Sequence, residues 1–393
     1  MYLPFYSGRI PRSGKIWIVE ILSNHSAATL AKPAKPIPET YQRIVLINPT
    51  RYLGNLLIAG GLIQDFYTYC HSRNIRFLLV VDAAYRELLK DSLPAECLLF
   101  YPRQLIKSAG FLTKIPAYLG CLNRIRKFSA DIAFNIEEDS VSHRLTQLSG
   151  AGFKLGSNLK RNKHGYDHVM DINYQNGPPE QKHRWYGFAE IFTRLGLPAT
   201  RPAYLKLGID RVSEALRMKL TQLGLEPETP FVIIHASAAK DYKKWPAVYF
   251  AQLVVLLKAQ GFKSVLIGAG AADQEANHAI VQILKHQHPE PVALDLCNQL
   301  SLSELAALLT SASAMVGNDS GPFHLASALG LPGCVIFGPT DVALWRPLGE
   351  HSIVLKSSES CATECTKSGC VFENRCLKSI TPAMVMEKLS PLL

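Results

Sequence analysis

A polar turn with the sequence GNDSGP carries the strongest chemical signal in the chain. It follows an apolar run at 314–318 that predicts a buried strand, and it leads into a predicted helix beginning near Pro322. The free N–H groups and positive dipole end of such a helix bind anions, and Gly321 would let a diphosphate approach the backbone. Two interpretations stay open: an anion site, or a helix start capped by Asp319 or Ser320.

Two adjacent lysines, Lys243 and Lys244, form a second candidate site. They follow the predicted strand FVIIHA (231–236) and precede Trp245 and a predicted helix. Positive charge at a helix start is unfavourable unless an anion is present. Ser237 adds a hydroxyl near the same edge. Either these groups bind phosphates, or the lysines are exposed beside a structural tryptophan.

A glycine-containing turn in the first part of the chain shows the same pattern of strand, turn and helix. The apolar run RIVLINP (43–49) is followed by Gly54 and a helical stretch. Gly54 could bring a ligand or the facing domain close to the backbone, although a tight turn before an apolar helix is also consistent with the pattern.

The nine cysteines fall into two groups. Five are scattered in apolar surroundings and are typical of small core residues: Cys70, Cys97, Cys121, Cys297 and Cys334. The others are Cys361, Cys365, Cys370 and Cys376, spaced C-x3-C-x4-C-x5-C. This spacing lacks paired CxxC knuckles, so metal binding, free thiols and a disulfide all remain open.

Short apolar runs that alternate with helical segments must position these residues. Such alternation predicts an α/β fold with parallel strands and right-handed crossovers, here two doubly wound, Rossmann-like domains with a cleft between them. Because ligands of open α/β sheets bind at the carboxyl ends of strands, the three turns would face that cleft. The expected division is an N-terminal extension and linker at 1–40, a first domain at 41–205, a second domain with a Cys-rich tail at 206–380 and a C-terminal helix at 381–393.

Composition and charge limit the class of protein and the kind of partner that we expect. Hydrophobic residues make up 48% of the 393 residues and charged residues 19%, as in globular proteins with a large core. Residues 1–206 hold 27 Lys/Arg against 15 Asp/Glu, and the remainder holds 15 against 17, so the whole net charge of +10 arises in the first half. That half is expected to meet an anionic partner. No nucleic-acid-binding motif is recognisable, so we expect no nucleic acid. No apolar run is long enough to span a bilayer and no signal peptide is evident, so we expect a cytoplasmic chain, peripheral at most to the inner membrane.

Together the motifs resemble glycosyltransferase family 9, the bacterial ADP-heptose:lipopolysaccharide heptosyltransferases. The resemblance covers roughly residues 43–390 and is most specific in GNDSGPFHLASALGLP, FGPTD, the KKWP segment and HRWYGFAEIFTRLGLP. It implies a GT-B fold and an inverting transfer of heptose without a catalytic metal. The first domain would hold an anionic glycolipid acceptor, the lipopolysaccharide core at the inner membrane surface, and the second would hold ADP-heptose.

The resemblance also assigns roles to single residues. Lys243 would contact the donor phosphates and stabilise the departing nucleoside diphosphate. Donor contacts would also come from Ser237, Lys244, Asp319, Ser320, Gly321 and His324. Gly54 and Asn55 would lie on the acceptor side. The late cysteines fall where many relatives carry cysteines, in one branch with iron, so a structural iron or zinc is expected at the four-cysteine cluster and no cofactor is required for catalysis.

One position departs from the family pattern. The first motif of the family normally ends Gly-Asp, and that Asp is the general base, whereas this chain has Gly54-Asn55. An amide cannot accept the proton, and general-base help contributes about 10²–10⁴ in rate. Either another carboxylate substitutes, with Glu137, Glu138 and Asp139 as the candidates, or activity is low, or the protein only binds the nucleotide sugar. The three acidic residues could equally form a solvated loop.

Overall fold

The structure is a computed structural model. It describes residues 35–393 apart from 109, 138, 158–164, 173–176, 179–180, 210–211, 227, 289, 359–369 and 371. Most of the expected extension at 1–40, together with Glu138, Cys361 and Cys365, therefore lies outside the described residues. Among the described helices, none combines the length and apolar character needed to cross a bilayer.

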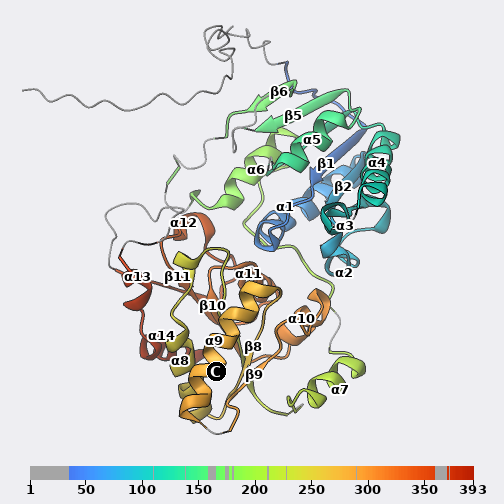
Figure 1. Ribbon diagram of the computed structural model, residues 1–393. Coiled ribbons are helices and arrows are strands. Elements are labelled where there is room, and N and C mark those ends of the chain that lie inside the picture. The colour runs from blue at the N-terminus through green and yellow to red at the C-terminus, as the bar shows by residue number, and fades with distance from the viewer. Residues whose placement is uncertain are drawn as a thin grey trace, which may run out of the picture. The chain divides into compact units, whose positions relative to one another are not determined.

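Two six-stranded parallel sheets organise the chain from residue 36 onward (Figure 1). The sheet of the first half contains β1 (Arg43–Asn48), β2 (Arg76–Asp82), β3 (Leu98–Tyr101), β4 (Ile132–Phe134), β5 (Phe153–Ser157) and β6 (His168–Met170). The sheet of the second half contains β7 (Phe231–His235), β8 (Lys263–Leu266), β9 (Ala293–Asp295), β10 (Ala314–Asn318), β11 (Gly333–Phe337) and β12 (Ser352–Lys356).

Both sheets have the same strand order. The first runs β3-β2-β1-β4-β5-β6 and the second β9-β8-β7-β10-β11-β12, which is the doubly wound order of Rossmann folds. In each sheet the order reverses between the first and fourth strands, β1 and β4 or β7 and β10. Ligands of such sheets bind outside the carboxyl ends of the strands at this reversal, so each half has one topologically favoured site. The predicted α/β fold with two doubly wound, Rossmann-like sheets is confirmed.

Helices cover both faces of each sheet. The first half contains α1 (Leu53–Ser72), α2 (Arg86–Leu89), α3 (Arg103–Ser108), α4 (Phe111–Phe128), α5 (Ser140–Leu148) and α6 (Arg184–Arg194). The second contains α7 (Glu214–Gln222), α8 (Ala247–Ala259), α9 (Ala271–Gln287), α10 (Leu302–Leu309), α11 (Gly321–Ala328), α12 (Val342–Trp345), α13 (Arg375–Lys378) and α14 (Pro382–Leu389). The helix α8 ends just before Gly261, whose φ of +84° suits glycine.

Alternating side chains divide the core. In β1, Ile44 packs with α1 and α6, whereas Val45 packs with α4 on the opposite face. In β7, Ile233 packs with α10 and α11, whereas Val232 packs with α8 and α14. The strands are buried on both faces, and their continuous apolar runs made them recognisable in the sequence.

The chain between the halves lies along α1. Ala203 and Leu205 pass so close to Gly61 and Gly60 that a Cβ on either glycine would lie 2.4 Å from them. Gln64 completes the contact by accepting from the Lys206 N–H at 2.7 Å. Two adjacent glycines weaken a helix, and the passage of this segment explains their position. The glycine- and proline-rich stretch 196–230 also contains α7, which the sequence pattern did not predict.

Candidate donor-binding site

Three polar side chains meet at the point in the second sheet where the strand order reverses. At the end of β7, His235 is 4% exposed, and its Nδ1 lies 3.0 Å from the Ser320 hydroxyl at the start of α11. Its Nε2 faces Asp273 Oδ2 of α9 at 3.5 Å, the outer limit of a hydrogen bond. Sequence analysis named Ser320 but missed His235 and Asp273. The histidine could have been found, because it ends a predicted strand at the ligand-binding edge.

Asp273 is held as a carboxylate. Burial alone would raise its pKa, but hydrogen bonds from His235, the Ala269 N–H and Ser237 outweigh burial and lower the pKa to about 2. The Ala269 bond measures 2.8 Å. Ser237 is buried beside this carboxylate, so the predicted hydroxyl does lie at the edge of the strand-order reversal.

The two candidate lysines have different partners. Lys243 donates to Asp319 Oδ2 at 2.9 Å, which joins the lysine segment to the GNDSGP turn. Lys244 instead contacts Asp241 at 2.8 Å, a carboxylate that is 94% exposed. Of the two, Lys243 is therefore the lysine that the fold brings to the turn.

The N-terminus of α11 has no side-chain cap. Ser320 occupies the N-cap position, but its hydroxyl is bonded to His235, and the Asp319 carboxylate is paired with Lys243. The capped-helix interpretation is therefore wrong for both residues. An uncapped N-terminus keeps its N–H groups and dipole available for an anion.

Asn318 fastens the turn to the lysine segment. Its buried amide accepts from the Trp245 N–H at 2.9 Å and donates to the Ala236 carbonyl at 2.8 Å. Trp245 is 2% exposed and donates its indole N–H to Ile380. The tryptophan is thus structural, and it fixes the backbone that carries Lys243.

An apolar cavity of about 220 Å³ opens beside this turn. Its lining comes from the carboxyl ends of β8 and β9, from α10, and from Pro322 of α11. Asp273 contributes a charged group, and Leu53 of α1 adds a wall from the first half. An apolar cavity with few polar groups, at a strand-order reversal, has the character of a small-molecule site.

His324 of α11 contacts residues of the first half. A Cβ on Gly54 would lie 2.9 Å from the His324 ring, so Gly54 permits the close approach of the facing half that its position in the sequence suggested. Tyr204 lies 2.7 Å from His324 Nδ1 and accepts from the Leu348 N–H at 3.0 Å. Burial lowers the pKa of His324 to about 4, partly opposed by Asp319, so the ring is neutral at pH 7. Sequence analysis missed Tyr204.

The strand-order reversal of the first sheet carries Glu137. This residue is 1% exposed and accepts from the Thr50 hydroxyl at 2.9 Å, within the loop between β1 and α1. Asn55 is half-buried in the first turn of α1. Asp139 caps α5 through the N–H groups of Val141 and Ser142. Of the two candidate carboxylates that the structure describes, Glu137 is the one bonded to the loop before Asn55.

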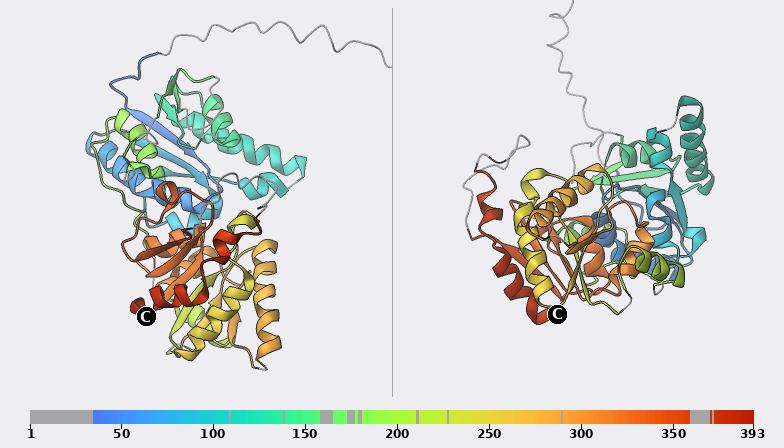
Figure 2. Two further views of the ribbon diagram at one scale, coloured as in Figure 1. Left: turned by 90° about the vertical axis from the view of Figure 1, so that its left-hand side faces the viewer. Right: turned by 60° about the horizontal axis from the view of Figure 1, so that its bottom comes forward.

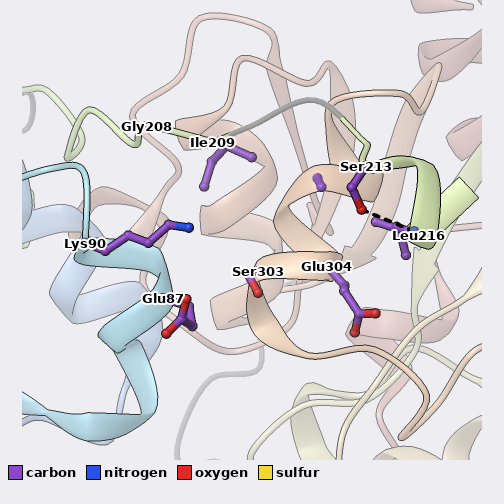
Figure 3. Close-up of a pocket in the computed structure, with 9 residues that line it drawn as sticks. Glu87, Lys90, Gly208, Ile209, Ser213, Leu216, Ser303 and Glu304 are labelled. Atoms are coloured by element: carbon purple, nitrogen blue, oxygen red, sulfur yellow. Dashed lines mark hydrogen bonds between the residues drawn. The ribbon is translucent and has the colours of Figure 1, made fainter.

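A second cavity, of about 180 Å³, lies near the segment that joins the halves. Figure 3 shows Glu87 of α2 and Lys90, which directly follows α2, opposite Ser303 and Glu304 of α10. Two of its polar groups already have partners, since Ser213 caps α7 and Glu304 belongs to a capping box and pairs with Lys219. It lies away from the GNDSGP turn, and we do not assign it to the donor.

The predicted metal site stays a prediction. Of the four clustered cysteines, the described ones are Cys370, whose sulfur accepts from the Asn374 N–H at 3.3 Å, and Cys376, which is buried. Within the described part of the chain, no group of three or more His, Cys, Asp or Glu side chains is arranged to hold a metal.

Known proteins are similar to this chain in sequence. Lipooligosaccharide heptosyltransferase 2 of Campylobacter jejuni is 31% identical over 171 residues, which is 43% of this chain and 51% of that protein. Lipopolysaccharide heptosyltransferase 3 of Escherichia coli is 24% identical over 316 residues, or 77% and 85% of the two chains. The chain spans about half the length of the first curated relatives it matches.

The fold has a close counterpart among solved structures. ADP-heptose lps heptosyltransferase II of E. coli superposes with a TM-score of 0.65 at 21% identity, covering 89% of this chain and 98% of that one. The family model of glycosyltransferase family 9 (heptosyltransferase) matches residues 121–375, well over half of the chain and all of the donor-side residues described above. The chain therefore belongs to glycosyltransferase family 9 and has its GT-B fold.

Proposed function

We propose that this protein transfers heptose from ADP-heptose to a lipopolysaccharide core acceptor, with inversion, in one displacement that needs no catalytic metal. The observation that carries the proposal is the uncapped N-terminus of α11, which adjoins both Lys243 and the apolar cavity. A nucleoside diphosphate needs these three features together: an apolar wall for the base, N–H donors, and a cation for the phosphates.

The donor would bind with its base in the cavity. Leu296 and Leu305 offer apolar walls, and the Asp273 carboxylate can accept from ribose hydroxyls. The diphosphate would then meet the first turn of α11 and Lys243. As the glycosidic bond breaks, negative charge grows on the departing phosphate, and donors already fixed in position stabilise it without reorganisation.

The acceptor would bind on the first half, where the basic surplus of the chain is found. Phosphates and carboxylates of a lipopolysaccharide core are attracted by such a surface. We further propose that the protein acts at the cytoplasmic face of the inner membrane as a peripheral protein. If a metal is present, we propose that it is a structural iron or zinc at the cysteine cluster, which metal analysis of the purified protein would detect.

Asn55 supports a second candidate function, binding of a nucleotide sugar without turnover. Asp139 is engaged as a helix cap, and Glu137 is buried beneath the loop that carries Thr50. The Asp139 carboxylate is thus committed to the cap, and Glu137 lacks the exposure expected of a general base that meets a bulky acceptor. Glu137 remains the carboxylate best connected to that loop, and Glu137→Gln tests it directly.

The test is ADP release from ADP-heptose with a panel of truncated lipopolysaccharide cores, measured for wild type, Asn55→Asp and Glu137→Gln. Acceptor-dependent release by wild type would support the transferase and refute the inert alternative. If Glu137 is the base, Glu137→Gln lowers the rate by about 10²–10⁴. No ADP release by wild type, together with a large increase in ADP release by Asn55→Asp, would indicate a weakened enzyme. Failure of all three to bind ADP-heptose would refute the donor assignment.

A further inference from the structure

The helices α3 and α4 expose an apolar face. Of the large hydrophobic side chains exposed among the described residues, Leu105, Leu112, Ile115 and Leu119 all belong to this pair of helices. Leu112 is 88% exposed and Leu119 53%. The three residues of α4 are spaced i, i+3 and i+7, so they lie on one side of the helix.

The exposed face belongs to the N-terminal half of α4. The C-terminal half is anchored, because Cys121, Leu122 and Ile125 pack against the first sheet. A Cβ on Gly120 would meet no atom within 4 Å, which confirms that the intervening surface is open. Figures 1 and 2 show α4, in teal, on the outer side of the first sheet in all three views.

The segment that contains α3 and α4 is also strongly basic. Between Glu96 and Asp131 the chain contains six Lys or Arg residues and no Asp or Glu. Among the described residues, no carboxylate lies within ion-pair distance of Lys107, Lys114 or Arg124. An exposed apolar stripe on a helix pair that also exposes basic groups is complementary to a bilayer with anionic headgroups, with leucines entering the interface and lysines meeting phosphates.

The helix pair also begins at the ligand-binding edge of the first sheet. Arg103, the first residue of α3, donates to the Pro49 carbonyl in the loop between β1 and α1 and forms an ion pair of 2.7 Å with Asp82 at the end of β2. The start of α3 therefore lies at the carboxyl edge of the sheet, beside the loop that leads to Gly54 and Asn55, whereas α4 packs on the face opposite to α1.

We propose that the exposed face of α3 and α4, defined by Leu105, Leu112, Ile115, Leu119, Lys107 and Lys114, docks the protein on an anionic lipid bilayer. The inference deepens the proposed function, since its purpose rests on an acceptor carried by lipid. Docking itself requires no turnover, so the two proposals can fail separately.

Co-sedimentation of the full-length protein with vesicles tests the inference. One vesicle contains phosphatidylglycerol and phosphatidylethanolamine, and the other contains only phosphatidylcholine. The variants are Leu112→Glu/Leu119→Glu for the apolar stripe and Lys107→Glu/Lys114→Glu for the charge. Met218→Glu is the matched control, because Met218 is an equally exposed apolar residue, 58%, on α7 of the other half. Melting curves and ADP-heptose binding establish that each variant is folded.

Wild type is expected to sediment with the anionic vesicles, and less so as salt rises from about 0.05 to about 0.5 M. Loss of each leucine lowers the partition coefficient roughly tenfold, and loss of each lysine about fivefold or more. Met218→Glu behaves as wild type. The leucine variant keeps wild-type ADP release on a soluble, delipidated core but loses at least about tenfold on the same core in vesicles.

Three results would overturn the inference. Wild type that fails to sediment with anionic vesicles has no docking surface. If the α4 variants sediment as wild type does, the docking surface lies elsewhere on the protein. A wild-type dimer that Leu112→Glu/Leu119→Glu converts to monomer would assign the face to a second copy of the chain. Absence of turnover on every acceptor, with vesicle binding intact, would refute only the proposed function.

Discussion

Neighbouring lysines with different partners allow a sharp test of the donor site. Lys243 is 24% exposed and pairs with Asp319, which is 10% exposed and lies in the GNDSGP turn. Lys244 is 26% exposed and pairs with Asp241, which is 94% exposed. Because residue type and exposure are matched, Lys243→Ala and Lys244→Ala differ mainly in the location of the partner.

The expected losses differ by orders of magnitude. Removal of one fixed donor to developing charge costs about 10²–10³ in kcat, and we expect this loss for Lys243→Ala. Its unfolding free energy should also fall by about 1–3 kcal/mol, because the largely buried Asp319 carboxylate loses its partner. A solvent-exposed pair contributes at most about 1 kcal/mol, so Lys244→Ala should change stability by a few tenths of a kcal/mol and leave the rate within about threefold.

Three measurements check these values: ADP release for the rate, calorimetry for ADP affinity, and urea unfolding for stability. The double variant Lys243→Ala/Asp319→Ala isolates the coupling, which should lie near 1–3 kcal/mol, roughly the range found for contacting residues. If Lys244→Ala lost as much activity as Lys243→Ala, the argument from ion-pair location would be refuted. Full activity of Lys243→Ala would remove the lysine from the mechanism altogether.

Two further predictions concern the contact between the halves. Gly61→Ala should lower the unfolding free energy by about 1–3 kcal/mol in urea, because its Cβ would lie 2.4 Å from the Ala203 carbonyl oxygen. Gly120→Ala, with nothing within 4 Å, should instead stabilise by about 0.5–1 kcal/mol, and equal effects of the two would contradict this reasoning. Burial lowers the pKa of His183 and of His324 to about 4. The hydrogen bond to the Arg346 carbonyl partly opposes this shift in His183, and the Asp319 charge partly opposes it in His324. In the unfolded chain the pKa of both histidines is near 6.5, so the unfolded chain binds more protons than the folded chain between about pH 4 and pH 6.5. The stability that the neutral histidines allow is therefore full above about pH 6.5. It falls toward pH 4 by up to about 1.4 kcal/mol per pH unit for each histidine. Urea unfolding of wild type and His183→Gln measures this slope, and a slope unchanged in the variant would contradict the assignment.

Local sequence accounts for much of the fold. The strands β1, β2, β7, β10 and β11 follow from short apolar, β-branched runs, because strands buried on both faces have no polar alternation to obscure them. The strands β5 and β12, with the sequences FKLGS and SIVLK, lack so clear a signal and were not predicted. The strand β6, with the sequence HVM, was not predicted either.

The chemistry of single residues was likewise visible, but their pairing was not. The turn, the lysines and Gly54 were recognisable because each follows a strand whose carboxyl end must reach the ligand-binding edge. Which lysine reaches the turn depends on a contact between residues 76 positions apart, and the Tyr204–His324 bond spans 120. A local pattern cannot encode which of several possible partners the packing of strands and helices brings together.

The sequence by itself therefore determined the α/β class, the resemblance to glycosyltransferase family 9 and the residue types available for binding an anion. Tertiary structure decided that Ser320 and Asp319 leave α11 uncapped, that Lys243 and not Lys244 joins the turn, and that α4 leaves an apolar face uncovered. The physical reason is the same in each case. Propensity and periodicity act over a few residues, whereas hydrogen-bond satisfaction and burial are settled only when distant segments meet.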